Sequence, residues 1–333
     1  MNLDILKNLS RRNLVIGGVV IAALAWFFFG GGCSEAEANE SRVAAMGGDA
    51  RLFLDDNTTM YTFPGLISQF PHVNVEDGGS ATVLHAWGEG AVAGISMDSG
   101  NTNWIQTMYG TADYGVMLGT DLTSDGLDDG TSSSAFDVRY GRTFAGGDFG
   151  VGFNWGSTTV DTLETSAWGL DVDYRGQDGS LGMFNISPLL GLSLVTGEND
   201  SQTWAVDAGF GLNDTFAEGG RVVAGVFGSF VRATETVLEE DVSVTSYVIP
   251  RVTLGAEYDL FSWMTLRAGA NRETSFNDGA IDHNFVQSYG VGFRHGALAL
   301  DGVLSDGVLQ SGPYMISGDS NDLFTQMSLT YNF

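Results

Sequence analysis

The feature that most constrains this chain is an alternation of apolar and polar residues that recurs from about residue 72 to the carboxyl terminus. The last stretch shows it best. Counting back from Phe333 to Leu323, every second residue is apolar except Thr325, and the intervening residues are polar apart from Phe324. Because successive side chains of a β-strand point to opposite faces, this pattern predicts a strand with one apolar and one polar face.

The same period of two recurs in several earlier stretches, among them 149–156, 168–175, 204–213, 251–260 and 264–271. Glycine is abundant (47), proline is scarce (5) and charged residues make up only 17% of the chain. This composition is typical of many glycine-punctuated strands and not of a helical bundle. A mean hydropathy near zero excludes a protein of many membrane helices, but not a barrel whose two faces average out.

Aromatic residues stand at the ends of the apolar runs, where the aromatic girdles of a membrane barrel belong. They are Trp155, Trp168, Tyr174, Trp204, Tyr258, Trp263, Tyr331 and Phe333. Only a closed barrel lets strands cross lipid with every backbone group paired. We therefore expect an all-β fold, a transmembrane antiparallel β-barrel over residues 72–333 with about fourteen strands, twelve to sixteen being allowed. A soluble secreted β-sandwich is the alternative.

Residues 1–38 have the pattern of an export signal peptide. The charged residues Lys7, Arg11 and Arg12 precede an apolar run at 14–29, and an A-x-A cleavage site follows at 36–38. We therefore expect the mature chain to begin at Asn39. Three alternatives stay open: lipoprotein processing at Cys33, a twin-arginine signal and an uncleaved anchor.

The chain is strongly acidic, with 41 Asp and Glu against 14 Lys and Arg and a formal net charge of −27. Such a surface repels nucleic acid, whose binding requires Lys and Arg at the phosphates. The acidic stretches 121–130, 198–201, 235–241 and 277–282 are expected to form the longer loops. Their carboxylates are possible Ca²⁺ ligands, although the spacing is not that of an EF-hand and a solvated acidic loop is the simpler interpretation.

The alternation is missing from residues 41 to 71, which contain glycine- and proline-rich turns instead. This stretch resembles the start of FadL/PorV-like outer-membrane β-barrels, which carry R-x-x-x-M-G-G, then D-D or D-N, then N-P-A. The matching residues are Arg42, Met46, Gly47, Gly48, Asp55 and Asp56, and Phe63, Pro64 and Gly65 stand where N-P-A is usual. The resemblance implies that residues 39–71 form a plug or hatch segment inside the barrel. A periplasmic linker is the alternative.

The final strand resembles the closing strand of bacterial outer-membrane barrels, whose terminal aromatic is read by the barrel-insertion machinery. Leu329, Tyr331 and Phe333 are the residues that carry this signal. One departure is the pair Gln326 and Met327, where a glycine is often found.

Ionisable residues occupy the polar face in the middle of several strands. They are Arg139, Asp171, Asp173, Asp207, Arg251, Glu257, Arg267, Arg294 and Asp301. Inside a barrel they would either tune permeation by charge or pair with one another and with the plug.

Nothing in the sequence supports catalysis. The four histidines, at 72, 85, 283 and 295, do not have metal-ligand spacing. Ser288 and His295 lie too far apart along a strand to hydrogen-bond, and no third partner is marked. We expect neither an enzyme nor a bound metal or cofactor.

The resemblance implies one of two roles. One is passive uptake of hydrophobic or small molecules, and the other is an accessory barrel in protein secretion or surface attachment. A general porin and a purely structural or adhesive barrel are further possibilities. We expect a monomer in the outer membrane of a Gram-negative bacterium, in contact with lipid and lipopolysaccharide and inserted by the barrel-assembly machinery.

Overall fold

The computed structural model describes residues 40–333 with several gaps. The gaps are 54–55, 78, 89, 99–104, 125–130, 161–162, 177–178, 182–183, 198–200, 238–239, 278–279 and 306–322. The expected export signal, Cys33 and Asp55 lie outside the described residues, as do residues 125–130, 198–200, 238–239 and 278–279 of the four acidic stretches. Within the described ranges, the structure has no helix of the length and apolarity that a membrane span requires.

Four short helices come first: α3 (Glu40–Ala45), η1 (Ala50–Leu52), α4 (Thr59–Thr62) and η2 (Pro64–Gln69). The strands are β1 (His72–Glu76), β2 (Ser80–Ala86), β3 (Val92–Asp98), β4 (Ile105–Gly110), β5 (Tyr114–Ser124), β6 (Thr131–Phe144), β7 (Gly147–Val160), β8 (Leu163–Gly176), β9 (Gly179–Leu181), β10 (Phe184–Gly197), β11 (Gln202–Ala217), β12 (Gly220–Val237), β13 (Glu240–Phe261), β14 (Met264–Asn277), β15 (Ala280–His295), β16 (Leu298–Leu304) and β17 (Phe324–Asn332).

All seventeen segments form one antiparallel sheet, which closes because β1 pairs with both β17 and β2. The short β9 continues the line of β8 along β10, so the barrel has sixteen strand positions. The expected all-β antiparallel barrel is thus confirmed, and the estimate of fourteen strands is slightly low. Strands of five to seven residues such as β1–β4 show too few alternating residues to be counted with confidence from a sequence.

The outer face of the wall is apolar and ends in aromatic residues at both rims. Toward one rim, Trp204 packs on Phe230 at 4.8 Å and Phe230 packs on Tyr247 at 5.0 Å between ring centroids. Toward the other rim, Trp263 stacks between Phe261 and Phe293. Along β11 the outward Trp204 and Phe216 mark these two levels. At ~3.4 Å rise per residue and ~45° tilt, their spacing covers about 29 Å, close to the thickness of a bilayer core.

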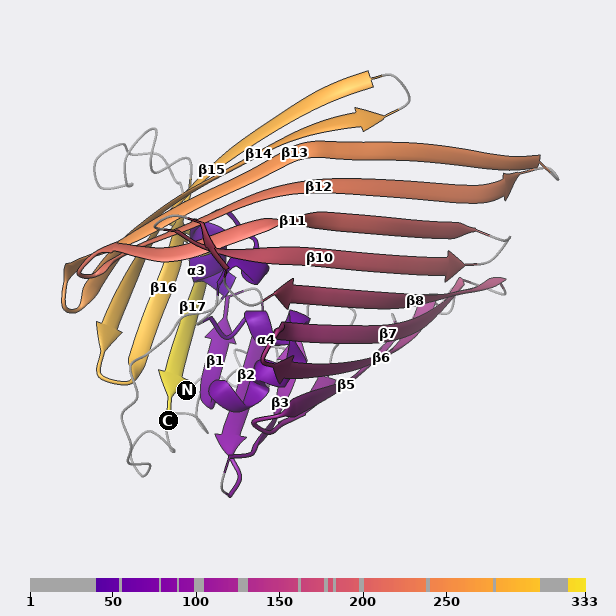
Figure 1. Ribbon diagram of the computed structural model, residues 1–333. Coiled ribbons are helices and arrows are strands. Elements are labelled where there is room, and N and C mark those ends of the chain that lie inside the picture. The colour runs from indigo at the N-terminus through magenta and orange to yellow at the C-terminus, as the bar shows by residue number, and fades with distance from the viewer. Residues whose placement is uncertain are drawn as a thin grey trace, which may run out of the picture.

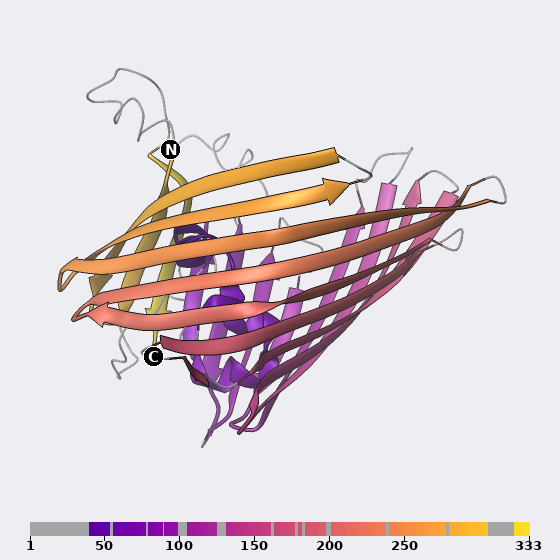
Figure 2. The same ribbon diagram turned by 45° about the horizontal axis from the view of Figure 1, so that its top comes forward.

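The wall is uneven in height. Strands β6–β8 and β10–β15 contain 14 to 22 residues, whereas β1–β4, β16 and β17 contain 5 to 9. A tilted membrane strand needs about 9–11 residues. Figures 1 and 2 show the long strands β10–β15 reaching far beyond the short strands next to the chain ends. The barrel therefore has a tall side and a low side.

The topology places all four acidic stretches at the same end of the barrel. They fall where β5 is followed by β6, β10 by β11, β12 by β13, and β14 by β15. The expectation of longer loops is wrong for 235–241 and 277–282, because the described residues of these two stretches belong to β12, β13, β14 and β15. The beginning of β1 and the end of β17 lie together at the opposite end, where the Phe333 amide donates to the Pro71 carbonyl at 3.3 Å. In bacterial barrels the end with longer loops faces outward from the cell. The acidic stretches thus belong to the outer end.

Candidate functional site: the inner segment against the barrel wall

Residues 40–70, here called the inner segment, lie inside the barrel and contact its wall on several sides. Helix α3 packs against β14–β17, η1 against β11 and β12, and η2 against β4–β7. Figure 1 shows these indigo helices enclosed by the strands. The segment that the sequence singled out by its missing alternation therefore crosses the lumen.

Two apolar clusters hold the inner segment to opposite parts of the wall. One joins η1 and the end of α3 to β10 and β12, and the other joins α4 and η2 to β2–β5. The first consists of Val43, Met46, Leu52, Phe53, Leu189, Val223 and Phe227. The second consists of Met60, Phe63, Leu66, Ile67, Phe70, Leu84, Val92, Met108 and Met117. Burial of this apolar area is the main force that keeps the segment in the lumen.

The second half of the inner segment packs on a row of four glycines in the wall, here called a glycine seat. The four members are paired in register across β4–β7, and they are Gly110, Gly115, Gly141 and Gly150. A Cβ on Gly115 would lie 1.8 Å from the Pro64 carbonyl oxygen, and one on Gly150 would lie 2.2 Å from that of Thr62. No side chain fits there, so backbone rests directly on backbone. Pro64 also starts η2, a position where its missing N–H costs nothing.

A second glycine seat receives the Met46–Gly47–Gly48 turn. Gly47 and Gly48 have φ of +103° and +85°, a conformation that disfavours other residues. A Cβ on Gly255 would lie 2.4 Å from the Met46 carbonyl oxygen, and one on Gly269 would lie 2.4 Å from the Gly47 nitrogen. The two motifs that the sequence marked at 46–48 and 63–65 are thus the two points of closest approach to the wall.

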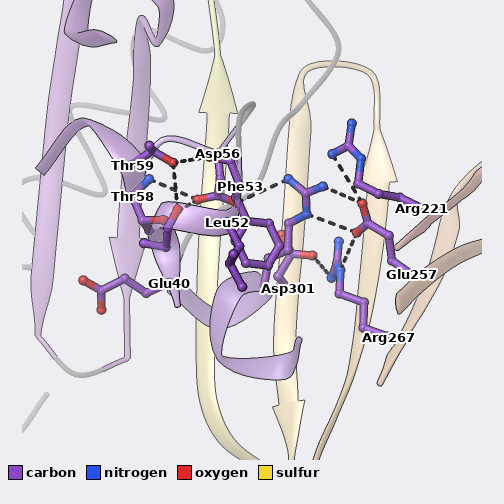
Figure 3. Close-up of polar contacts among 12 residues, drawn as sticks. Glu40, Leu52, Phe53, Asp56, Thr58, Thr59, Arg221, Glu257, Arg267 and Asp301 are labelled. Atoms are coloured by element: carbon purple, nitrogen blue, oxygen red, sulfur yellow. Dashed lines mark hydrogen bonds and ion pairs between the residues drawn. The ribbon is translucent and has the colours of Figure 1, made fainter. Parts of the chain in front are cut away.

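Arg42 and Glu257 form the centre of a buried charge network between the inner segment and the wall. Figure 3 labels Glu257 and its neighbours Asp56, Arg267 and Asp301. Arg42 donates to Glu257 at 2.5 and 3.1 Å and to Asp56 at 3.3 Å. Arg267 donates to Glu257 at 3.1 Å and also to Asp301. Except for the nearby Arg221, these side chains are almost fully buried. Three sequence-predicted charges, Glu257, Arg267 and Asp301, therefore meet at one place, together with two predicted motif residues.

Asp56 has a second role in shaping the inner segment. Its Oδ1 accepts from the Thr58 amide at 3.0 Å and from the Thr58 hydroxyl at 2.7 Å. The Thr59 hydroxyl in turn donates to the Phe53 carbonyl at 2.7 Å. One carboxylate thus both orders the turn into α4 and neutralises Arg42.

A second network joins η1 to the tall side of the wall. Arg51 donates to Asp207 at 2.7 Å and to Asp49 at 3.0 Å, and Arg251 reaches Asp207 at 3.1 Å. Both guanidinium groups lie over the Phe227 ring, at 5.0 and 4.7 Å. Burial alone would lower the pKa of Arg51, but Asp49 and Asp207 outweigh it and the pKa is raised. Asp207 and Arg251 are two of the lumen charges predicted from the sequence.

Arg51 and Asp49 were not singled out from the sequence. The sequence does contain a clue to this pair. Arg51 is a basic residue in a segment expected inside the barrel, and a buried arginine requires a nearby carboxylate. Arg175 was also missed. It donates to Asp148 at 2.6 and 2.9 Å and to the Phe53 carbonyl at 3.0 Å, and it lies over the Phe63 ring at 4.9 Å. Its position on the polar face of β8 is the only clue that the sequence offers.

The remaining predicted charges are more scattered. Arg139 is 3.6 Å from Asp137 and 3.7 Å from Asp171, and it donates to the Tyr61 carbonyl at 3.2 Å. Asp173 faces the lumen beside Asp207 and Arg51. Arg294 lies near the end of β15 and, among the described residues, joins neither of these networks. Six of the nine predicted charges thus contact the inner segment or a residue that does.

The closing strand joins β1, as the end of a barrel must. Leu329 faces outward, and Tyr331 and Phe333 meet edge to face at 5.5 Å. Ser288 donates to the Ala45 carbonyl inside the barrel, whereas His295 is the exposed last residue of β15. Among the described residues, no group of three His, Cys, Asp or Glu is arranged to hold a metal ion.

Above the inner segment, the tall side turns valines toward the lumen. Val195, Val244 and Val286 occupy inward positions of β10, β13 and β15, and they are 40, 45 and 51% exposed. The register supports this orientation: Val286 pairs with Asn271, whose side chain reaches the Gly47 carbonyl at 3.5 Å. Val231 of β12 lies on the same face as Ser229, which donates to Asp207 at 3.0 Å. We call Val195, Val231, Val244 and Val286 the luminal valines. Sequence reasoning missed them because it expected a polar interior.

The comparisons with known proteins give structural likeness only. No protein-family model and no curated protein matches the chain. Similar solved structures include the Pseudomonas putida toluene transporter TodX, with 11% identity, 91% of this chain and 98% of that chain covered, and a TM-score of 0.40. BamA from Haemophilus ducreyi lacking POTRA domains 1-3 has 9% identity, coverage of 79% and 69%, and a TM-score of 0.41. The Neisseria meningitidis FrpB iron transporter has 11% identity and a TM-score of 0.35. The match covers 70% of this chain but only 45% of FrpB.

Proposed function

We propose that this protein is an outer-membrane β-barrel that takes up small apolar molecules passively, with the inner segment as its plug. The observation that carries the proposal is the group of luminal valines, which expose apolar surface to the lumen directly above the inner segment. The membrane location rests on the outward apolar belt between two aromatic levels.

Exposed luminal valines are unfavourable in a water-filled channel, because each Å² of apolar surface left in water forgoes about 25 cal/mol. The lumen of a general porin is polar for this reason. Sites for apolar ligands are concave and mostly apolar, with a few polar groups that fix orientation. The valines, with the Arg51–Asp207 network beside them, have this character.

The contacts of the inner segment also favour the uptake proposal over a general porin. It meets the wall through two apolar clusters, two glycine seats and two charge networks, so its contacts leave the lumen obstructed at its level. A molecule that enters from the outer end would reach the luminal valines before it reaches the plug. An accessory barrel in secretion or surface attachment is the second candidate, favoured by the four acidic stretches gathered at the outer end.

The test is photolabelling of the protein in outer-membrane vesicles with a diazirine-bearing alkylbenzene, followed by mapping of the labelled peptides. We expect label on the inner faces of β10, β12, β13 and β15, competed by unlabelled alkylbenzene. Replacing Val195 and Val244 by Asp should reduce this label at least fivefold.

The control is Thr158→Asp, an inward position on β7 outside the valine group. This variant should label like the unaltered protein. Label that is confined to the outer belt, or that persists in the double Asp variant, would overturn uptake through the valine-lined lumen.

A further inference from the structure

On β14 and β15, a group of polar side chains interrupts the apolar belt on the outside of the barrel. Asn271 reaches the Gly47 carbonyl inside the lumen, so alternation along β14 turns Arg272 outward. Arg272 pairs in register with Val252 of β13 and Phe285 of β15, and its side chain is exposed. It therefore presents a positive charge to the surroundings of the barrel.

Three further polar residues lie around Phe285 on the same outward surface. His283 and Gln287 flank Phe285 along β15 and are exposed. The register makes both of them diagonal neighbours of Arg272, at Cα separations of about 7–8 Å. Thr274 directly faces His283, and its hydroxyl lies 3.1 Å from His283 Nδ1. We call Arg272, Thr274, His283 and Gln287 the outward polar group.

The outward polar group stands in the outer half of the membrane. On β14, Phe276 marks the outer aromatic level because it pairs with Tyr247, and Met264 marks the other level through its pairing with Phe293. Arg272 is nearer to Phe276, about 10 Å below the outer level at ~3.4 Å rise per residue and ~45° tilt. An arginine side chain can extend its guanidinium group toward the headgroups while its stem stays in the apolar region.

The outward surface of β12–β15 is positively charged, although the chain as a whole has a formal net charge of −27. Between the two aromatic levels, the outward positions of these strands hold no Asp or Glu among the described residues. Arg232 of β12, which pairs with Trp204, adds a second exposed positive charge at the outer level. An ionisable group at membrane depth is costly unless a polar or charged partner accepts its hydrogen bonds. An anion of the surrounding membrane meets this requirement.

The anionic group that a bilayer offers near this depth is the phosphate of a lipid headgroup. A guanidinium group binds phosphate oxygens through two parallel hydrogen bonds, and imidazole, hydroxyl and amide groups supply further donors. We propose that the outward polar group binds a phosphate of lipopolysaccharide in the outer leaflet, with Phe285 against the acyl chains. The inference assigns residues to the lipopolysaccharide contact expected from the sequence, and it does not depend on the uptake role.

Native mass spectrometry of the refolded protein in detergent, titrated with bisphosphorylated lipid A, measures this binding. We expect a one-to-one adduct. Arg272→Gln combined with His283→Ala should weaken it about tenfold or more, because hydrogen bonds to charged groups are the stronger ones. The matched control is Arg142→Gln, which changes another exposed arginine that pairs with Tyr114 and Phe149 near the inner end of β6. This variant should bind lipid A like the unaltered protein.

Two further probes identify the source of the phosphate. Dephosphorylated lipid A should bind the unaltered protein as weakly as lipid A binds the double variant, and millimolar inorganic phosphate should not displace the lipid. Equal affinity for the two lipids, an equal loss in the Arg142 variant, or displacement by inorganic phosphate would overturn the proposal. Heat-modifiable gel mobility checks that each variant is a folded barrel. The comparison of the two lipids uses the unaltered protein, so it decides the question even where a variant does not fold.

Discussion

Gly115 in the barrel wall lies so close to Pro64 of the inner segment that a Cβ on the glycine would come within 1.8 Å of the proline carbonyl oxygen. The neighbouring glycines of β4, β6 and β7 repeat this relationship at the same level. These wall glycines do more than separate strands. Because they lack side chains, they allow the inner segment to pack directly on the inside of the barrel.

The first prediction concerns this seat. Gly150→Ala should weaken the docking of the inner segment, because overpacking costs about 1–3 kcal/mol and the obstructing atom is backbone. Limited proteolysis of vesicles should then cleave within residues 40–70 faster than in the unaltered protein. Gly156→Ala on the same strand is the matched control, since its Cβ would find its nearest neighbour 3.8 Å away. Equal cleavage of both variants would mean that the seat does not hold the segment.

The second prediction concerns the plug role. Deletion of residues 41–71 should convert a silent barrel into one that passes steady ion current in planar bilayers, because it removes the chain that crosses the lumen. Heat-modifiable gel mobility checks that the deleted barrel still folds. Steady current from the unaltered protein would instead indicate a general porin.

The third prediction concerns the buried network at Glu257. Glu257→Gln should destabilise the protein by about 3–5 kcal/mol, because it leaves Arg42 and Arg267 buried with too little negative charge. Urea unfolding from detergent, followed by tryptophan fluorescence, measures the change. Glu218→Gln is the control, an exposed carboxylate in the turn between β11 and β12, and it should shift stability by less than about 1 kcal/mol.

The fourth prediction concerns Phe333. Its removal should lower the amount of protein in the outer membrane severalfold while leaving unfolding of the refolded barrel nearly unchanged. The residue lies at the rim, where it makes ring contacts with Tyr331 and His85 and donates a backbone hydrogen bond to the Pro71 carbonyl. Asn332→Ala should leave the amount in the membrane unaffected. If refolded barrels without Phe333 are as unstable as they are scarce in cells, the residue acts in folding and not as an insertion signal.

The alternation of apolar and polar residues was sufficient to predict a barrel, because burial of one strand face against lipid leaves a local pattern with a period of two. The missing alternation likewise marked the inner segment. The strand count was less predictable, because strands as short as β1 and β4 carry too little pattern. The lumen charges were found as a class, yet Asp49, Arg51, Asp148 and Arg175 were missed.

The sequence by itself thus determined the alternating pattern of the strands, the acidic character of the chain and the position of the non-alternating segment. Each of these is encoded in residues that are neighbours along the chain. Only the tertiary structure decided which charges meet, which glycines form the two seats and which end carries the acidic stretches. These properties depend on register between strands far apart in the chain: a shift of one residue would move Glu257 from the lumen to the lipid face and separate it from Arg42.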